Sequence, residues 1–198
     1  MKNSETKNSF LLFINQFIDK KDKQMKSQIE IALESFLPLL LKKNEFLVRE
    51  NEICTHFCYI ESGILQHAIE IEGEEKTTYL GLRNSVTSSL KSFLDATPSQ
   101  KNIKALVDTQ LLVIDLKNFR HLLQNNAAFH QFYFKLIEKQ IMLIDDYRID
   151  LLTLSPEERY HKLLITEPKL LQEVPLHYLA SFLGISNRHM SRIRKNIK

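Results

Sequence analysis

Between residues 38 and 115 the chain breaks into short segments that are rich in β-branched and aromatic residues and partly alternate apolar with polar positions. Examples are EFLVRE, FCYIESG and ALVDTQLLVID. Turn-forming pairs such as Glu50-Asn51, Ser62-Gly63 and Glu72-Gly73 separate these segments. Several strands spaced about 8 to 12 residues apart are typical of a β-barrel or sandwich. We therefore expect residues 38–115 to form a β-roll.

Helical periodicity takes over on both sides of this region. Apolar residues recur at steps of three and four between residues 9 and 35, with a polar break at KKDKQ. A second helical stretch begins near Phe119, pauses at Asn125-Asn126, and continues from about Ala127 to Leu152 without Gly or Pro. That last helix is longer than the average globular helix of about 11–12 residues.

The apolar residues of this long helix allow two interpretations. They pack the helix on the β-roll, or they form a coiled-coil-like seam with a second copy of the chain. Both hold if one side of the helix faces the roll and the other side faces a partner. The residues expected at a dimer seam are Tyr133, Leu136, Ile137, Ile144 and Tyr147.

The cations of the chain are unevenly distributed. The 198 residues carry a formal net charge of +3, but the segment from Ser186 to Lys198 holds five cations and no acid. No stretch approaches the ~18 apolar residues of a membrane span. No export signal is recognisable, and two cysteines are too few for a disulfide framework. We therefore expect a cytoplasmic protein without membrane association.

The segment LASFLGISNRHMSRIRK, residues 179–195, has the pattern of a helix-turn-helix. Small Ala180 suits a position where two helices approach closely, and Gly184 supplies a turn residue that can adopt a positive φ. Ser186 is then the N-cap of the second helix. The alternative is a plain helical hairpin with a solvated basic face. The expected packing residues are Leu179, Ala180, Leu183, Gly184, Ile185, Met190 and Ile193.

The second helix of a helix-turn-helix enters the major groove of DNA. We expect Asn187 and Arg188 to read bases, because their side chains carry the donors that base edges accept. His189 either contacts DNA or is merely solvated. The flanking donors are expected to hold phosphates. The complete expected DNA-binding set is Ser186, Asn187, Arg188, His189, Ser191, Arg192, Arg194 and Lys195.

A resemblance to a known family lies in four segments: LVRENEICTHFCYIESGIL (47–65), IEGEEKTTYL (71–80), SPEERYHKLL (155–164) and VPLHYLASFLGISNRHMSRIRK (174–195). Together they resemble the Crp/Fnr transcription regulators, and the last two look like the branch common in Bacteroidetes-type bacteria. The resemblance implies an α+β fold with leading helices and a jelly-roll-like sensor domain of cyclic-nucleotide-binding type (1–126). A long dimerisation helix (127–153) and a helix-turn-helix domain (154–198) would follow. It further implies a homodimer that binds double-stranded DNA, with RNA polymerase as another partner.

Two departures from the family pattern affect function. The family's cyclic-nucleotide pocket carries Gly-Glu and then Arg-Ser/Thr-Ala, but the corresponding stretch, 81–107, lacks Gly-Glu and places the Arg position near 99–101. A phosphate then lacks its bidentate guanidinium partner, so we expect no cyclic AMP binding, with Lys101 or Arg83 as possible substitutes. Any effector is unknown, and no cofactor is expected. Asn187 and Arg188 replace the family's usual Arg or Pro and Glu, so the operator should differ.

The sequence gives little support for redox, metal-binding or catalytic chemistry. Cys54 and Cys58 lie four apart in an expected strand, where they form either a redox switch or part of the core. The seven histidines form neither HxH nor HExxH, which argues against a metal site. His56 and His67 lack the spacing of a cupin-like enzyme, and no catalytic triad signature is visible.

The sequence therefore predicts a sequence-specific DNA-binding regulator of the Crp/Fnr type that does not respond to cyclic AMP and is not an enzyme. The alternative is a protein-interaction or small-molecule sensor scaffold whose β-roll remains but whose DNA binding is lost. Salt dependence separates the two, because phosphate contacts lose affinity steeply as salt rises.

Overall fold

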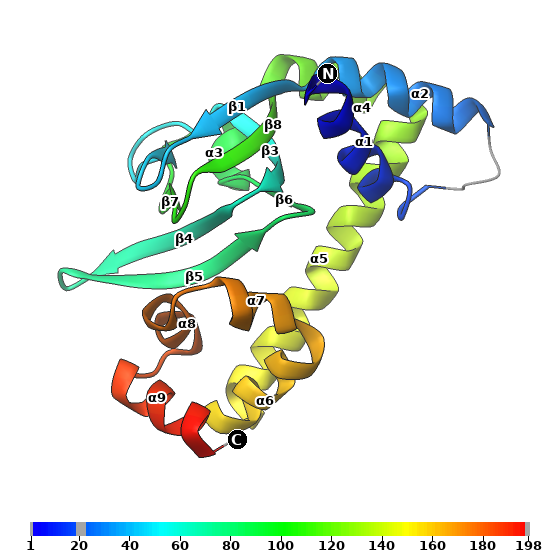
Figure 1. Ribbon diagram of the computed structural model, residues 1–198. Helices are drawn as coiled ribbons and strands as arrows, with labels where there is room; N and C mark the ends of the chain where they lie inside the picture. The colour runs from blue at the N-terminus through cyan, green and yellow to red at the C-terminus, as the bar shows by residue number, and fades with distance from the viewer. Residues whose placement is uncertain (1, 19–22, 197–198) are drawn as a thin grey trace.

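The computed structural model describes residues 2–18 and 23–196. Its centre is a β-roll of two four-stranded antiparallel sheets (Figure 1). One sheet has the strand order β1-β8-β3-β6 and the other β2-β7-β4-β5. The strands are β1 Leu37–Leu41, β2 Phe46–Val48, β3 His56–Ser62, β4 Ile64–Ile71, β5 Glu74–Leu82, β6 Ser85–Thr87, β7 Asn102–Ala105 and β8 Thr109–Asp115. The expected β-roll is thus confirmed.

Turns at positive φ shape the roll. Glu72 and Gly73, with φ of 54° and 80°, join β4 to β5 in a hairpin. Gly63, with φ of 99°, lies between β3 and β4, where an added Cβ would stand 2.3 Å from Thr109 Oγ1. Only glycine fits there, because both the backbone conformation and the available space exclude a side chain.

Helices cover one end of the roll. They are α1 Lys2–Ile14, α2 Lys23–Glu34, α3 Leu90–Asp95, α4 Leu116–Asn125 and α5 Ala127–Thr153. The predicted pause lies at Asn126, whose side chain accepts a hydrogen bond from the amide of Phe129 and so begins α5. The helix expected over 9–35 is two helices, and residues 19–22 of its polar break lie outside the described residues. Sequence periodicity did not predict the short α3.

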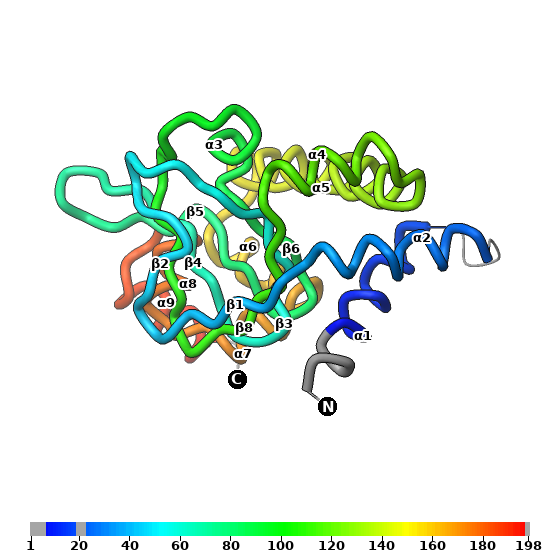
Figure 2. The backbone as a smooth tube through the Cα atoms, turned by 90° about the horizontal axis from the view of Figure 1, so that it is seen from above, coloured from blue at the N-terminus to red at the C-terminus, as the bar shows by residue number. Residues whose placement is uncertain are grey.

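An aromatic core joins α1 and α5 to the sheet of β3. The rings of Phe10 and Tyr59 stack at 4.3 Å between centroids, and Phe132 meets Phe10 edge-on at 6.3 Å. Seen from above, the paired α1 and α2 and the paired α4 and α5 project from the same side of the roll (Figure 2). Long α5 then runs from this core to the C-terminal helices (Figure 1).

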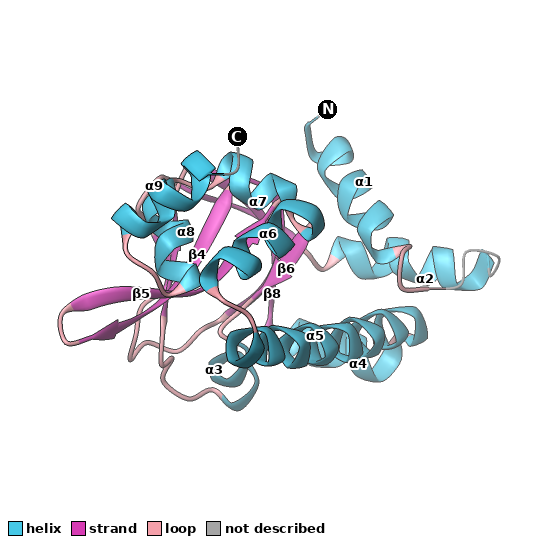
Figure 3. Ribbon diagram, turned by 90° about the horizontal axis from the view of Figure 1, so that it is seen from below, coloured by secondary structure: helices cyan, strands magenta, loops and turns pink. Residues whose placement is uncertain are grey.

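Four C-terminal helices form a second body below the hairpin of β4 and β5 (Figure 1), and in the view from below they lie in front of β4 (Figure 3). They are α6 Pro156–Thr166, α7 Pro168–Glu173, α8 Leu176–Leu183 and α9 Asn187–Asn196. Pro168 is the first residue of α7, and a single residue separates it from the end of α6. Their apolar cluster includes Ile64, Leu80 and Leu106 of the roll, so the two bodies share a packed interface. None of the described helices is long and apolar enough to span a membrane.

Candidate nucleic-acid interface

Helices α8 and α9 form the predicted helix-turn-helix. Gly184 ends α8 in the left-handed conformation at φ 71°, and its amide bonds back to the last turn of α8. The amide of Ile185 donates to the carbonyl of Ala180 at 3.0 Å, which completes the turn. Ser186 then caps α9, because its Oγ accepts from the amide of His189 at 3.2 Å.

Most of the residues expected to pack this motif are buried. Ala180 is 1% exposed and belongs to the same apolar cluster as Met190 and Ile193 of α9. Ile185 is half-buried, and Gly184 is exposed in the turn. The buried members are Leu179, Ala180, Leu183, Met190 and Ile193.

The outer face of α9 is exposed and basic. In the described part of the chain, the cations of α9 make no ion pair, and no side-chain hydrogen bond engages them. They are therefore available to an anionic partner. The exposed residues from the expected DNA-binding set are Ser186, Asn187, Arg188, Ser191, Arg192, Arg194 and Lys195.

His189 differs from this set because it is half-buried against α6. Its Nε2 lies 2.7 Å from Oε1 of Glu157. This bond lowers the pKa of the Glu157 carboxyl, and the positive charge of Arg192 contributes in the same direction. The sequence did not predict the pairing, because the two residues are 32 positions apart and no local pattern links them.

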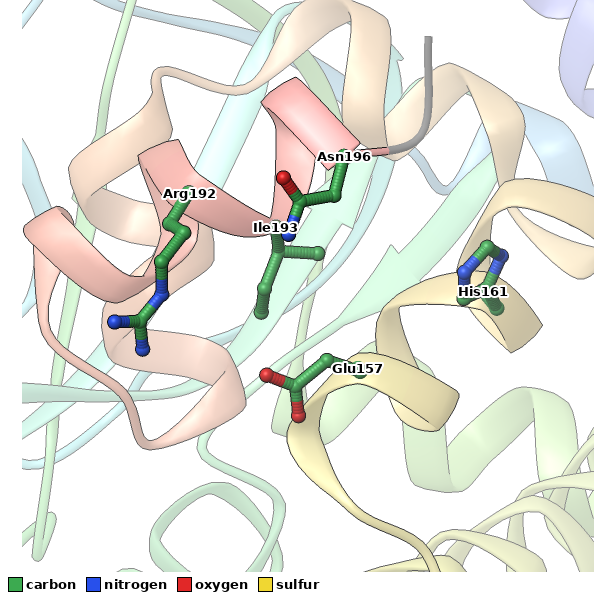
Figure 4. Close-up of a pocket in the computed structure, with 5 residues that line it drawn as sticks. All are labelled: Glu157, His161, Arg192, Ile193 and Asn196. Atoms are coloured by element: carbon green, nitrogen blue, oxygen red, sulfur yellow. The ribbon is translucent and has the colours of Figure 1, made fainter.

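Figure 4 shows the surroundings of Glu157. Its carboxylate points from the first turn of α6 toward α9, on the side from which Arg192 and Ile193 project (Figure 4). His161 and Asn196 complete the lining of this pocket. The neighbouring Glu158 has another partner, since it forms a capping box with Ser155.

The helix-turn-helix is attached to the β-roll by a polar contact. The amide of Thr77 on β5 donates to Oγ of Ser181 on α8 at 2.8 Å. A second contact comes from α5, where the hydroxyl of Tyr147 donates to the carbonyl of Phe182 at 3.2 Å and their rings stack. The orientation of α8 is therefore coupled to both the roll and the long helix.

The residues expected at a dimer seam divide between two environments. Leu136 is 2% exposed in the core of its own chain, and Tyr133 packs on Phe57 and Phe119. With Tyr147 bound to Phe182, three of the five have intramolecular contacts. Leu136 is thus a core residue of its own chain, and the seam itself stays a prediction, because the periodicity of apolar residues did not distinguish the inner face of α5 from its outer face.

The outer face of α5 carries a different apolar stripe. Its members recur at steps of three, four, three and seven, which fits the heptad spacing of a coiled-coil seam. Ile144, from the expected set, is 65% exposed, and half-buried Ile137 lies on the same stripe. We define the α5 stripe as Phe134, Ile137, Ile141, Ile144 and Leu151.

The interior of the roll holds a small group of polar side chains. His67 is 4% exposed, and its Nε2 lies 2.5 Å from Thr87 Oγ1. Burial, reinforced by the charge of Lys101, lowers the pKa of His67 to about 3. Lys101 is itself largely desolvated, which lowers its pKa, whereas Arg83 is exposed in the turn before β6.

Both cysteines are buried and free. Cys54 precedes β3 rather than lying in it, so the expectation that both cysteines lie in one strand was wrong. Burial raises the pKa of the Cys58 thiol, with a further contribution from Cys54. A thiol with a raised pKa is a poor nucleophile, which favours the core-packing interpretation. Among the described residues, no group of His, Cys, Asp and Glu could hold a metal ion.

Comparison with known proteins agrees with this architecture. Residues 38–126 match the cyclic nucleotide-binding domain family. The chain is similar to the Thermus thermophilus catabolite activator protein, with 20% identity, a TM-score of 0.55, and coverage of 86% of this chain and 82% of that one. FixK2 from Bradyrhizobium japonicum gives 12% identity, a TM-score of 0.70, and coverage of 82% and 84%. No curated protein matches the sequence.

A third similar structure is a protein from Eubacterium rectale assigned to the Crp/Fnr family of transcriptional regulators. It is 18% identical, with a TM-score of 0.63 and coverage of 88% of this chain and 82% of that one. Residues 38–126 thus resemble a cyclic nucleotide-binding domain. Taken whole, it has the fold of Crp/Fnr-type regulators, which confirms the predicted fold class and resemblance. The Bacteroidetes branch stays a prediction.

Proposed function

We propose that this protein is a sequence-specific DNA-binding transcription regulator of the Crp/Fnr type, rather than an enzyme. The observation that carries the proposal is the outer face of α9, where exposed cations and amide or hydroxyl donors have no partner among the described residues. Helix α9 starts at a capped N-terminus and is supported from behind by Met190 and Ile193. A helix presented in this way suits the major groove.

The proposed role of each residue, base contact or phosphate contact, follows from its position along α9. Asn187 and Arg188 lie in the first turn, which is the part of a recognition helix that contacts base edges. Arg192, Arg194 and Lys195 lie further along and would hold phosphates, together with Ser186. Arg188 would favour guanine, because a guanidinium can donate to both O6 and N7.

We also propose that the protein works as a homodimer. The α5 stripe supports this, since large apolar side chains such as Ile141 and Ile144 are 62% and 65% exposed. An exposed apolar stripe at coiled-coil spacing is stabilised when a second helix covers it. A dimer would place two α9 helices on half-sites about one helical turn apart.

Two residues of the sensor domain support the proposal that the regulator does not respond to cyclic AMP. The positions corresponding to the family's phosphate-binding arginine hold Ser99 and Lys101. Ser99 Oγ bonds to Ser89, and Lys101 is largely desolvated. A different small molecule is therefore the expected effector, if the protein has one.

The test is a selection of duplexes from random DNA with the full chain, followed by titration of the winner at two salt concentrations. The proposal predicts a palindromic winner and a steep fall of affinity as salt rises, because each phosphate contact releases counterions. No enriched duplex at low salt would contradict the proposal and favour the scaffold alternative.

A further inference from the structure

Helix α9 contacts the rest of the chain through very few polar side chains. Its buried apolar residues, Met190 and Ile193, fix its depth in the domain. Within residues 2–18 and 23–196, the bond between His189 and Glu157 is the one side-chain hydrogen bond that joins α9 to another helix or strand. Apolar contacts are not directional, whereas a hydrogen bond is, so this bond restrains rotation of α9 about its own axis.

The chemistry of the pair sets the direction of the bond. An ionised carboxylate only accepts hydrogen bonds, so Nε2 of His189 carries the proton and donates to Glu157. Glu157 is not needed to start α6, because Ser155 and Glu158 already form the capping box. The carboxylate of Glu157 therefore interacts with α9, where the positive charge of Arg192 also lowers its pKa.

We propose that Glu157 is a positioning residue for the recognition helix. By holding His189 against α6, it fixes the rotation of α9 and removes His189 from base contact. Base reading then falls to Asn187, Arg188 and Ser191, which replaces the expectation that His189 itself contacts DNA. This inference rests on the proposed function, because it concerns how the same helix reads bases.

Rotation of α9 affects the two kinds of DNA contact differently. A bidentate contact to a base needs the donors of Arg188 in one plane with the base edge. Long side chains that bind phosphates, such as Lys195, can follow a small rotation through their own flexible bonds. Loss of the Glu157 contact should therefore reduce discrimination between sequences more than it reduces affinity for DNA in general.

The experiment compares affinities for the selected duplex and a scrambled duplex in wild type, Glu157→Ala and Glu157→Gln. Glu157→Ala removes both charge and acceptor, and we expect the specific-to-scrambled ratio to fall on the order of 3- to 10-fold. Glu157→Gln removes the charge but keeps an acceptor oxygen for His189, so it should restore most of the ratio. Glu173→Ala is the control, because it removes an exposed carboxylate from the same domain but from α7 rather than α6.

A purely electrostatic role for Glu157 would give a different pattern. Glu157→Ala and Glu157→Gln would then strengthen binding to both duplexes alike and leave the ratio unchanged, which would overturn the inference. A wild-type protein that prefers no duplex would overturn the proposed function and this inference with it. A wild type that discriminates, with an unchanged ratio in Glu157→Ala, would overturn this inference alone.

A measurement without DNA tests the contact itself. Carbon-detected NMR titration of the Glu157 carboxyl should give a pKa below the ordinary value in the free wild-type protein, because His189 donates to it. In His189→Ala the pKa of Glu157 should rise toward the ordinary value. An identical pKa in the two proteins would mean that the bond is absent in solution, and the positioning role would then be rejected.

Discussion

Gly184 illustrates how one residue determines the geometry of the proposed recognition helix. It adopts φ 71° between α8 and α9, and an added Cβ would meet nothing within 4 Å. The glycine is therefore needed for its backbone conformation and not for space. This position could be predicted from the sequence, because a glycine after an apolar helical stretch is a common helix end.

The Gly184→Ala variant tests whether the turn between α8 and α9 requires a positive φ. We expect the free energy of unfolding to fall by about 1 kcal/mol, because a Cβ disfavours the left-handed conformation. Gly184→Asn should cost less, since asparagine tolerates that conformation better. Urea denaturation of the three proteins measures both effects. Equal stability of Gly184→Ala and wild type would mean that the turn does not require positive φ.

The buried side chain of His67 should make the free energy of unfolding depend on pH. Its pKa is lowered to about 3 in the fold, against 6.5 for an ordinary histidine. Below pH 6.5 the unfolded chain binds a proton that the folded chain does not, so stability falls as the pH drops toward 3. The loss at pH 5 should be about 2 kcal/mol, from about 1.4 kcal/mol per pH unit.

Urea denaturation at pH 7 and pH 5 measures this loss. His67→Gln should lose less stability between the two pH values than wild type does, because it has no imidazole to protonate. His161→Gln, at an exposed position, is the matched control and should behave as wild type. Equal losses in wild type and His67→Gln would show that His67 is not held neutral in the fold.

At the scale of elements, α5 shows what sequence periodicity cannot decide. Its apolar residues were recognised, but they surround much of the helix, and the pattern alone did not assign them to a side. Tertiary packing determines which side of α5 each apolar residue faces. Leu136 lies in the aromatic core formed by α1, β3 and α5, whereas Ile144 remains exposed. Contacts between segments so distant in the chain leave no local signal.

The exposed stripe gives a test of dimerisation. Ile144→Lys should produce monomers while leaving each chain folded, because the side chain is 65% exposed in the single chain. A charge at the centre of a helix–helix seam disfavours association. Ile165→Lys, at an 83% exposed position on α6, is the control and should remain dimeric. Sedimentation equilibrium distinguishes the states, and a dimeric Ile144→Lys would place the interface elsewhere.

The contact between α8 and β5 gives a further test at this scale. Ser181→Ala removes the acceptor of the Thr77 amide, which should cost about 1 kcal/mol and speed hydrogen exchange at Thr77. Ser191→Ala, at an exposed site on α9, should leave that exchange rate unchanged. If Thr77 exchanges equally fast in wild type and Ser181→Ala, the helix-turn-helix is not attached to the roll by this bond.

At the scale of the whole molecule, local chemistry was predictable and long-range placement was not. The turn at Gly184, the cap at Ser186 and the two helices of the helix-turn-helix follow from a short local pattern. The pairing of Glu157 with His189 and the docking of Ser181 on Thr77 join segments 32 and 104 positions apart. Only the packed structure brings these residues together.

The central claim is that α9 reads DNA sequence, and base discrimination by Arg188→Ala tests it most directly. The measurement is the affinity of wild type, Arg188→Ala and Arg192→Ala for the selected duplex and its single-base variants. Arg188→Ala should relax the preference at one base position by about 1–3 kcal/mol, and Arg192→Ala should weaken all duplexes alike. If Arg188→Ala and Arg192→Ala both bind every duplex as wild type does, α9 is not the element that reads DNA.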